Sequence, residues 1–464
     1  MRCKFCCLGF LTFLLMFNVA SSSAGPAESA APQKPGMYHG PGSCAASSCH
    51  GNVQPQKLTR VMQNEYSTWI GQDKHANAYT VLTNDVSVRM GKILQTKCAD
   101  GSPCPPSQAP KCLACHSLHV APELHVQAFG PEDGVSCESC HGPSSGWLET
   151  HTHKDSHTDS VTYKQMNDLR DLRERTTVCL TCHIGTANKF VDHEMIAAGH
   201  PDLMFEITYF SFRMPQHWRD PEQDPWRSVQ AWGVGQAVQL RDSLYRLARR
   251  AGDHNTPWPE YSELDCYACH HSLSAASDSW RLKAADYYGN RRPGNPPWNE
   301  ARVIVFRDVI EELHPETAKQ LNKELWDVAD QMNKLNGNRQ DIAATATRAA
   351  ELANSLADKL NTQPYDSALT LRLMRRIAAN YSTIANAGYG SAAQAAMTLD
   401  DLSKAYQQNG GQEMNSGLSA SIDALNKLLN EENPSAYSAA QFADRLQNVS
   451  KALGVRQGSA SGSN

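Results

Sequence analysis

The sequence predicts a mainly α-helical protein in which a ligand-rich region with long loops is followed by an antiparallel bundle of helices. Two observations support this prediction. All 15 cysteines lie before residue 270 and all 18 histidines before residue 315, so metal-binding chemistry belongs to the first part of the chain. From about residue 300 onward, apolar residues recur at helical spacing, which is typical of amphipathic helices around a core.

The composition excludes several classes of protein. Hydrophobic residues make up 41% of the 464 residues and charged residues 20%, which excludes a collagen-like, a disordered or a polytopic membrane protein. The formal net charge is -5 and no basic block occurs, so nothing favours a nucleic-acid partner.

The N-terminus has the pattern of a secretory signal peptide, expected over residues 1–24. Arg2 and Lys4 precede an apolar run over residues 8–19, and Ala24 ends a small-residue cleavage site. The run is too short to span a bilayer, so we expect an exported, periplasmic protein without a transmembrane segment after cleavage. Residues 25–42, rich in proline, glycine, serine and alanine, are expected to form a linker or extended arm.

A repeated motif of Cys, two residues, Cys and His follows this arm. It occurs at Cys112, Cys115 and His116; at Cys137, Cys140 and His141; at Cys179, Cys182 and His183; and at Cys266, Cys269 and His270. This pattern attaches haem c covalently, because the two thiols add to the two vinyl groups and the adjacent imidazole binds the iron. A fifth site, Cys44, Cys49 and His50, has four residues between the thiols and is also expected to carry haem.

Zinc or disulfide is the alternative for such cysteine pairs. Structural zinc does not require a histidine directly after every second cysteine, as all five pairs have here, so we expect five covalently attached haem c groups. Outside the signal peptide, Cys98 and Cys104 remain. They flank a turn and are expected to form a small disulfide, with a labile redox switch as the sharper alternative.

We expect residues 43–285 to form a pentahaem cytochrome c domain. Five haems over residues 43–271 leave about 46 residues for each, fewer than a protein-only core requires. The porphyrins are therefore expected to organise this region, with long irregular connections and no stable apo state. A basic helix near Arg246, Arg249 and Arg250 is expected to present a solvated face, with a docking patch for an acidic partner as the alternative.

Residues 286–456 are expected to form the C-terminal helical domain, and residues 457–464 a flexible tail. Pro364, Gly390, Gly410 and Pro434 separate apolar stretches, which predicts five or six antiparallel helices. The stretches are 305–313, 321–332, 352–360, 373–384, 418–429 and 442–453.

The second axial ligand of each iron decides between a carrier and a catalyst. Two protein ligands leave no site for a substrate, whereas one leaves an empty position. The candidate second ligands are His39, His75, His119, His125, His151, His153, His157, His193, His200, His217, His254 and His271.

From the first haem site onward, the order of motifs resembles the multihaem cytochromes similar to cytochrome c-554, a tetrahaem electron carrier. The resemblance covers about residues 43–185. Trp69 is followed six residues later by His75-Ala-Asn-Ala; KCLACH, Gly-Val-Ser-CESCHGP and a further CxxCH come next. His151 lies ten residues beyond His141.

The resemblance implies specific second ligands. His75 would be the distal ligand of the haem on His141, and His151 that of the haem on His50. It also implies that the iron on His116 lacks a protein distal ligand. His125 has no equivalent in that family, and two interpretations remain for it: a ligand of another haem, or a solvated loop residue.

Beyond residue 185 the chain departs from the family. His193 and His200 are seven residues apart, two helical turns on one face, with Gly-His-Pro ending the helix. We expect them to serve the fourth and fifth haems. Met195 and Met204 are more readily interpreted as core residues than as soft ligands.

The leading hypothesis is an exported pentahaem cytochrome that carries electrons between a redox donor and a redox acceptor, and not an enzyme. The alternative is a multihaem oxidoreductase acting on small nitrogen or sulfur species at an open iron on His116. Against it, the sequence contains no CxxCK site. An oligomer that stacks terminal haems between subunits is a third hypothesis.

Overall fold

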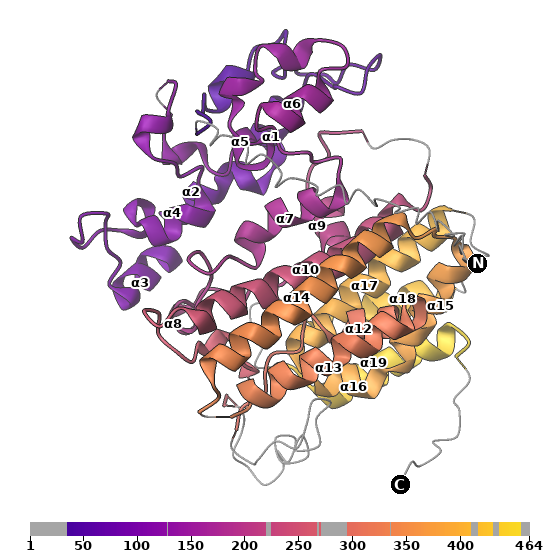
Figure 1. The fold of residues 1–464 in the computed structure, drawn as a ribbon. Helices are drawn as coiled ribbons and strands as arrows, with labels where there is room; N and C mark the ends of the chain where they lie inside the picture. The colour runs from indigo at the N-terminus through magenta and orange to yellow at the C-terminus, as the bar shows by residue number, and fades with distance from the viewer. Residues whose placement is uncertain are drawn as a thin grey trace, which may run out of the picture. The chain divides into compact units, whose positions relative to one another are not determined.

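The computed structural model describes residues 35–127, 129–219, 224–266, 269–270, 295–334, 336–409, 416–429 and 436–455. Every regular element in these ranges is an α-helix or a short 3-10 helix, so the predicted mainly α class is confirmed (Figure 1). All the elements described below belong to one compact unit, Gly36–Asn464. The predicted signal peptide and tail lie outside the described residues.

The first part of this unit consists of short helices joined by irregular segments, as predicted. Helices α1 to α6 have only four to ten residues each. They are α1 Glu65–Gln72, α2 Ala78–Val81, α3 Asp85–Leu94, α4 Pro110–His116, α5 Cys137–His141 and α6 His157–Tyr163. Short 3-10 helices lie before and between them: η1 Pro41–Cys44, η2 Lys74–Asn77, η3 Pro106–Gln108, η4 Pro122–Leu124, η5 Pro131–Asp133, η6 Ser144–Gly146 and η7 Thr150–Thr152.

Local signals define these short helices. The Asn84 side chain accepts a hydrogen bond from the Ser87 amide at the start of α3, and Gln95 ends α3 in the left-handed conformation with φ 50°. Pro110 occupies the first position of α4, where its missing N–H costs no hydrogen bond. Isolated helices of this length are marginal in water, so their stability must come from what they pack against.

Three helices connect this region to the bundle: α7 Leu172–His183, α8 His193–Ala198 and α9 Ile207–Arg213. The Asp171 side chain caps α7 by accepting from the Arg173 and Glu174 amides. One face of α7 buries Leu172 and Leu180 in the same apolar cluster as α10. α7 is therefore anchored on the bundle along its length.

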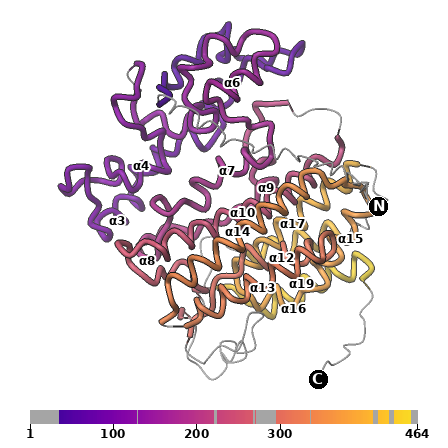
Figure 2. Tube along the Cα trace, in the orientation of Figure 1, coloured from indigo at the N-terminus to yellow at the C-terminus, as the bar shows by residue number. Residues whose placement is uncertain are grey.

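The bundle contains α10 Arg227–Gly252, α12 Ile304–Leu313, α13 Pro315–Met332, α14 Arg339–Thr362, α15 Ser367–Ala379, α16 Tyr381–Asn386, α17 Tyr389–Gln408, α18 Ser416–Asn426 and α19 Ala439–Ala452. The 3-10 helix η8 Tyr261–Glu263 follows α10. The long helices α10 and α14 run side by side (Figure 2). α14 presents Ala346, Ala350 and Ala353, all fully buried, which permits a close approach.

Glycines inside α10 have a packing role. A Cβ atom at Gly235 would lie 2.4 Å from Cγ2 of Ile207 on α9, and one at Gly233 would lie 2.7 Å from the hydroxyl of Tyr365. Any larger residue would push α9 or the segment before α15 away. The two glycines therefore set how closely these elements approach α10, at the cost of helix propensity.

The apolar stretches predicted after residue 300 fall on helices for most of their length. The fourth is divided between α15 and α16 at Asn380, and the fifth and sixth run past the ends of α18 and α19. Two long helices were not predicted in their observed place. Residues on nearly every side of α17 are buried, and many of them are alanine, serine and threonine. The helix therefore lacks the leucine periodicity that marks an amphipathic helix. α10 precedes residue 285, and yet it packs on α14 within the bundle.

The solvated basic face predicted on α10 is wrong for two of its three arginines. Arg246 and Arg250 are 7% and 5% exposed and pair with Glu263 and Glu260, whereas Arg249 is exposed. The acidic partners come from the segment that follows α10, which a helical pattern alone does not bring into contact. No helix in the described part of the chain is long and apolar enough to cross a membrane.

Candidate metal centres

Three of the Cys-x-x-Cys-His motifs lie at the ends of helices. The motif of His116 ends α4, that of His141 forms α5, and that of His183 ends α7. Residues i, i+3 and i+4 share one face of a helix, so both thiols and the imidazole of each motif point to one side. The ten motif cysteines take part in no disulfide, and the disulfide predicted between Cys98 and Cys104 is confirmed.

Four of the five motif histidines face a second histidine across an almost constant gap. The ring centres are 6.2 Å apart for His50 and His151, 6.2 Å for His183 and His75, 6.4 Å for His116 and His200, and 6.3 Å for His270 and His193. The angle between the rings varies from 19° to 86° while the separation hardly changes. A constant separation with a free angle indicates rings arranged about a common axis.

This separation fits one metal ion between each pair. Metal–imidazole bonds are about 2 Å long and a ring nitrogen lies about 1 Å from the ring centre, so two axial imidazoles have centres about 6 Å apart. Direct ring stacking brings centres closer, as for His125 and Phe129 at 4.0 Å. The donor set is also suitable, because neutral imidazoles are common axial ligands of haem iron.

Hydrogen bonds at Nδ1 leave Nε2 available in five of the paired histidines and in a further one, His217. Nδ1 of His50 donates to the Glu65 carboxylate at 2.9 Å, and Nδ1 of His75 donates to that of Asp73 at 2.9 Å. Backbone carbonyl oxygens accept from the other four: Ala78 from His116, Leu148 from His151, Pro201 from His200 and Pro215 from His217. Ligand histidines typically have this arrangement, since the bond at Nδ1 fixes the tautomer and the ring orientation.

His141 forms none of the four ring pairs, but His217 lies near it. Desolvation is the main reason that the pKa of His141 falls to about 4, and His217 is the nearby charge with the largest further effect. The segment of His217 is held in place by Arg219, which donates to the carbonyls of Gln56 and Thr59. His217 was one of twelve candidates from the sequence, where nothing singled it out.

Burial and neighbouring charges set the pKa of the other histidines in opposite directions. Burial lowers the pKa of His183 to about 4, with Phe205 and Phe210 packed against its ring. The hydrogen bonds that His50 and His75 donate to the Glu65 and Asp73 carboxylates raise the pKa of both histidines. The acid Asp73, two residues before His75, is a supporting group that the sequence analysis missed.

Several histidines are engaged elsewhere. Nε2 of His125 donates to the Val120 carbonyl at 3.3 Å while its ring stacks on Phe129, so it is placed as a structural residue. Nε2 of His157 lies 3.4 Å from the Asp168 carboxylate, and Nε2 of His254 bonds to Gln340. His271 lies outside the described residues.

The observed ring pairs differ from those implied by the resemblance in two places. The ring of His75 faces His183, where the resemblance paired it with His141. His116, for which the resemblance implied an open position, has His200 opposite it. His200 also lies outside α8, because Gly199 with φ 116° ends that helix and turns the chain. His193 and His200 therefore serve two different motifs.

Thiols of different motifs meet in pairs. Cys44 is hydrogen-bonded to Cys137, and Cys115 to Cys182. These bonds lower the pKa of Cys44 and lower that of Cys182 to about 5, while they raise the pKa of Cys137 and Cys115. The attachment edges of the first and third motifs, and of the second and fourth, are therefore adjacent.

A cavity of about 450 Å³ lies beside the third motif, a volume in the range of cofactor sites. Asn167 links it to the motif, since its side chain donates to the Cys140 carbonyl and its amide donates to that of His141. The lining residues are Pro143, Val161, Gln165, Met166, Asn167, Asp168 and Glu174.

Comparison with known proteins gives one match. The family model described as cytochrome c554 and c-prime matches residues 44–142, which include the first three motifs, His75 and the helices α1 to α5. No curated protein and no solved structure matches the chain.

Proposed function

We propose that this protein is an exported pentahaem cytochrome c that carries electrons between redox partners, because residues 44–142 match the family model described as cytochrome c554 and c-prime. Haem c supplies the one-electron chemistry when it is attached, by cycling its iron between the ferrous and ferric states. The chain holds the macrocycles through the ten motif thiols and the iron through imidazoles.

The single observation that carries the proposal is that motif histidines face second histidines across a gap fitting one metal ion. An iron held in such a gap would have two protein ligands, which would keep small molecules off it and suit electron transfer. On the ring pairs we assign His50 with His151, His116 with His200, His183 with His75 and His270 with His193. For His141 we assign His217, the histidine with the largest electrostatic effect on it. The alternative oxidoreductase would need His200 to leave His116.

The thiol contacts support an order for the electron route. The first motif adjoins the third through Cys44 and Cys137, and the second adjoins the fourth through Cys115 and Cys182. Cys140 of the third motif lies close enough to Cys179 and Cys182 of the fourth for their charges to interact. The segment from His193 to His200 joins the second motif to the fifth. The proposed route therefore runs through the motifs of His50, His141, His183, His116 and His270.

Haem counting and spin state test this proposal together. Pyridine haemochrome analysis of the mature protein is expected to give five haems per chain. Electron paramagnetic resonance of the oxidised protein is expected to show low-spin iron that does not change on addition of nitrite or hydroxylamine. A count of four would remove the site at Cys44, and a high-spin signal responsive to nitrite would favour the oxidoreductase.

Two matched histidine variants sharpen this test. His200→Ala is expected to convert the iron on His116 to a high-spin form that binds carbon monoxide when reduced. His254→Ala removes an exposed histidine that bonds only to Gln340 among the described residues, so the spectra are expected to stay unchanged. A low-spin, inert His200→Ala protein would contradict the assigned pair.

A further inference from the structure

A six-residue helix, α8, and the residues that flank it hold two of the assigned ligands. His193 begins α8 and faces His270, while His200 follows Gly199 and faces His116. One helical turn and a half has little stability of its own. The position of both imidazoles therefore depends on what fixes the start of α8.

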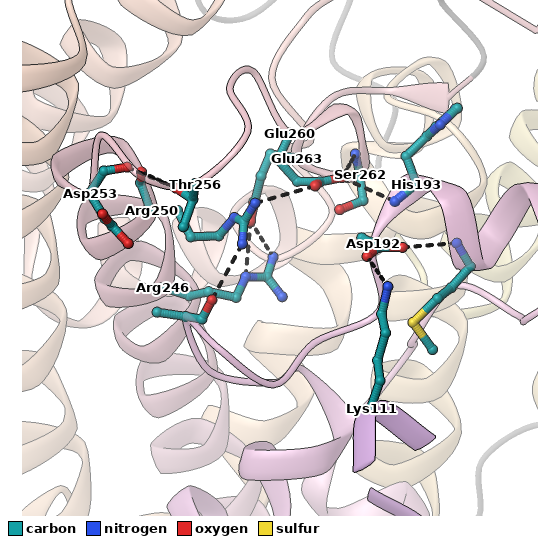
Figure 3. Close-up of polar contacts among 12 residues, drawn as sticks. Lys111, Asp192, His193, Arg246, Arg250, Asp253, Thr256, Glu260, Ser262 and Glu263 are labelled. Carbon is teal, nitrogen blue, oxygen red and sulfur yellow. Dashed lines mark hydrogen bonds and ion pairs between the residues drawn. The ribbon is translucent and has the colours of Figure 1, made fainter. Parts of the chain in front are cut away.

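Glu260 fixes that start from the side of the fifth motif. Its Oε1 accepts hydrogen bonds from the backbone amides of His193 at 3.0 Å and of Ser262 at 3.1 Å (Figure 3). Its Oε2 pairs with Nη2 of Arg250 on α10 at 3.4 Å. Glu260 is 8% exposed and Arg250 is 5% exposed, so this ion pair is shielded from water.

A second, parallel ion pair supports the same place. Arg246 of α10 binds the Glu263 carboxylate at 2.7 Å and donates to the Ile184 carbonyl at the end of α7. The guanidinium of Arg250 lies 4.0 Å from the ring centre of Phe190, between α7 and α8. Helix α10 is thus tied both to the segment that follows the fourth motif and to the segment that precedes the fifth.

Asp192 holds α8 from the side of the second motif. Its Oδ1 accepts from the Met195 amide, which caps α8, and its Oδ2 pairs with Nζ of Lys111 at 2.5 Å. Lys111 directly precedes Cys112. Asp192, just before α8, is therefore bound by Lys111, which precedes the second motif. His193, the first residue of α8, is bound by Glu260, which precedes the fifth motif (Figure 3).

From this arrangement we propose that Glu260 is a positioning residue for His193, acting through the backbone amide of that residue and braced by Arg250. Without the Glu260 acceptor, the first turn of α8 loses its tie to α10, and the imidazole of His193 is no longer held opposite His270. The inference rests on the proposed axial pairs. Its consequence is confined to the iron on His270, because Asp192 and Lys111 still hold the side of α8 toward His116.

The test compares Glu260→Ala with Glu260→Gln in the mature, haem-loaded protein. Glu260→Ala is expected to make about one fifth of the haem iron high-spin and able to bind carbon monoxide when reduced, as loss of one axial ligand requires. Glu260→Gln keeps an oxygen acceptor for the His193 amide and is expected to restore the low-spin spectrum. Glu324→Ala breaks an Arg–Glu pair with Arg348 within the bundle and serves as the control, with spectra unchanged.

The readouts separate this inference from the proposed function. Five low-spin haems in the unaltered protein together with a low-spin, inert Glu260→Ala protein would overturn the positioning role alone. Fewer than five haems, or high-spin iron before any substitution, would overturn the proposed function itself. A failure of Glu260→Gln to restore the low-spin spectrum would also contradict a role exercised through the backbone hydrogen bond.

Discussion

The region that carries the first three motifs and the C-terminal bundle obtain their stability in different ways. Helices α1 to α6 are at most ten residues long, whereas α10, α14 and α17 have 26, 24 and 20 residues. Both large apolar clusters consist of residues from Leu172 onward. Before that residue, the described chain buries only a scatter of large apolar side chains: Trp69, Leu82, Leu113 and Trp147.

This difference shows what a polypeptide needs when a cofactor provides the core. The bundle buries rows of leucine and alanine in two large apolar clusters, and this burial offsets the loss of chain entropy. The N-terminal region has turns, caps and paired histidines but little to bury apart from the macrocycles they are placed to hold. Its fold is therefore expected to depend on haem and that of the bundle not to.

The largest expected effect comes from removing the haems. A chain with all ten motif cysteines changed to alanine is expected to lose protection over residues 36–170 while residues 304–452 stay protected. Hydrogen exchange followed by mass spectrometry measures the two regions separately. Equal protection of both regions in the haem-free chain would contradict the prediction that only the N-terminal region depends on haem.

Truncation in the bundle core is expected to give the next largest effect. Leu356 is fully buried on α14, so Leu356→Ala should lower the free energy of unfolding of the bundle by about 2–5 kcal/mol. The haem count and spin state should not change, because the substitution lies away from every motif. Leu352→Ala, at a partly buried position on the same helix, is the control and should cost less.

A buried acid makes the stability of the bundle depend on pH. Burial is the main reason that the pKa of Asp308 is raised from 3.8 to about 6. Its folded-state pKa exceeds the unfolded value, so its stabilising contribution is complete below pH 3.8 and is lost as the pH rises through 6.

Asp308→Asn should therefore stabilise the protein by up to about 3 kcal/mol above pH 7, and hardly at all near pH 3.5. Thermal unfolding of both proteins from pH 3.5 to 8 measures the difference. The amide retains an oxygen for the hydrogen bond from Asn380. A difference independent of pH would show that the carboxyl group stays charged in the folded protein.

The smallest effect is expected at a surface ion pair. Lys323 and Asp327 are four residues apart on α13, with side chains 72% and 42% exposed. Lys323→Ala should change the free energy of unfolding by less than about 0.5 kcal/mol. Chemical denaturation measures this change. A loss as large as that of Leu356→Ala would mean that an exposed ion pair stabilises the bundle as much as its core does.

Much of the fold could be predicted from the sequence because it rests on local patterns. Cys-x-x-Cys-His fixes where thiols and imidazole lie on one helix face, and leucine periodicity marks most bundle helices. The same logic fails for α17, because its own residues, many of them alanine and serine, are buried on most sides of the helix and form no single apolar stripe. It also fails for Arg246 and Arg250, whose acidic partners lie beyond the end of their own helix.

The second ligands were harder to predict because they depend on contacts between distant segments. His151 was proposed opposite His50 from the resemblance, and the two rings do face each other. His75 faces His183, which lies outside the matched residues 44–142, so the matched segment alone does not determine this pair. His217 belongs to an irregular segment held by Arg219, and no periodic signal marks such a residue.

The fourth motif has a consequence for the order of maturation. Cys179 lies on the side of α7 that packs against the apolar cluster of the bundle, and burial raises the pKa of its thiol to about 11. A half-buried thiol with a raised pKa is a poor nucleophile toward a haem vinyl group. If the fourth motif carries haem as proposed, attachment at Cys179 is therefore expected to precede the packing of the bundle against α7. The order of the chain allows this, since α7 precedes α10 and the other bundle helices in the sequence.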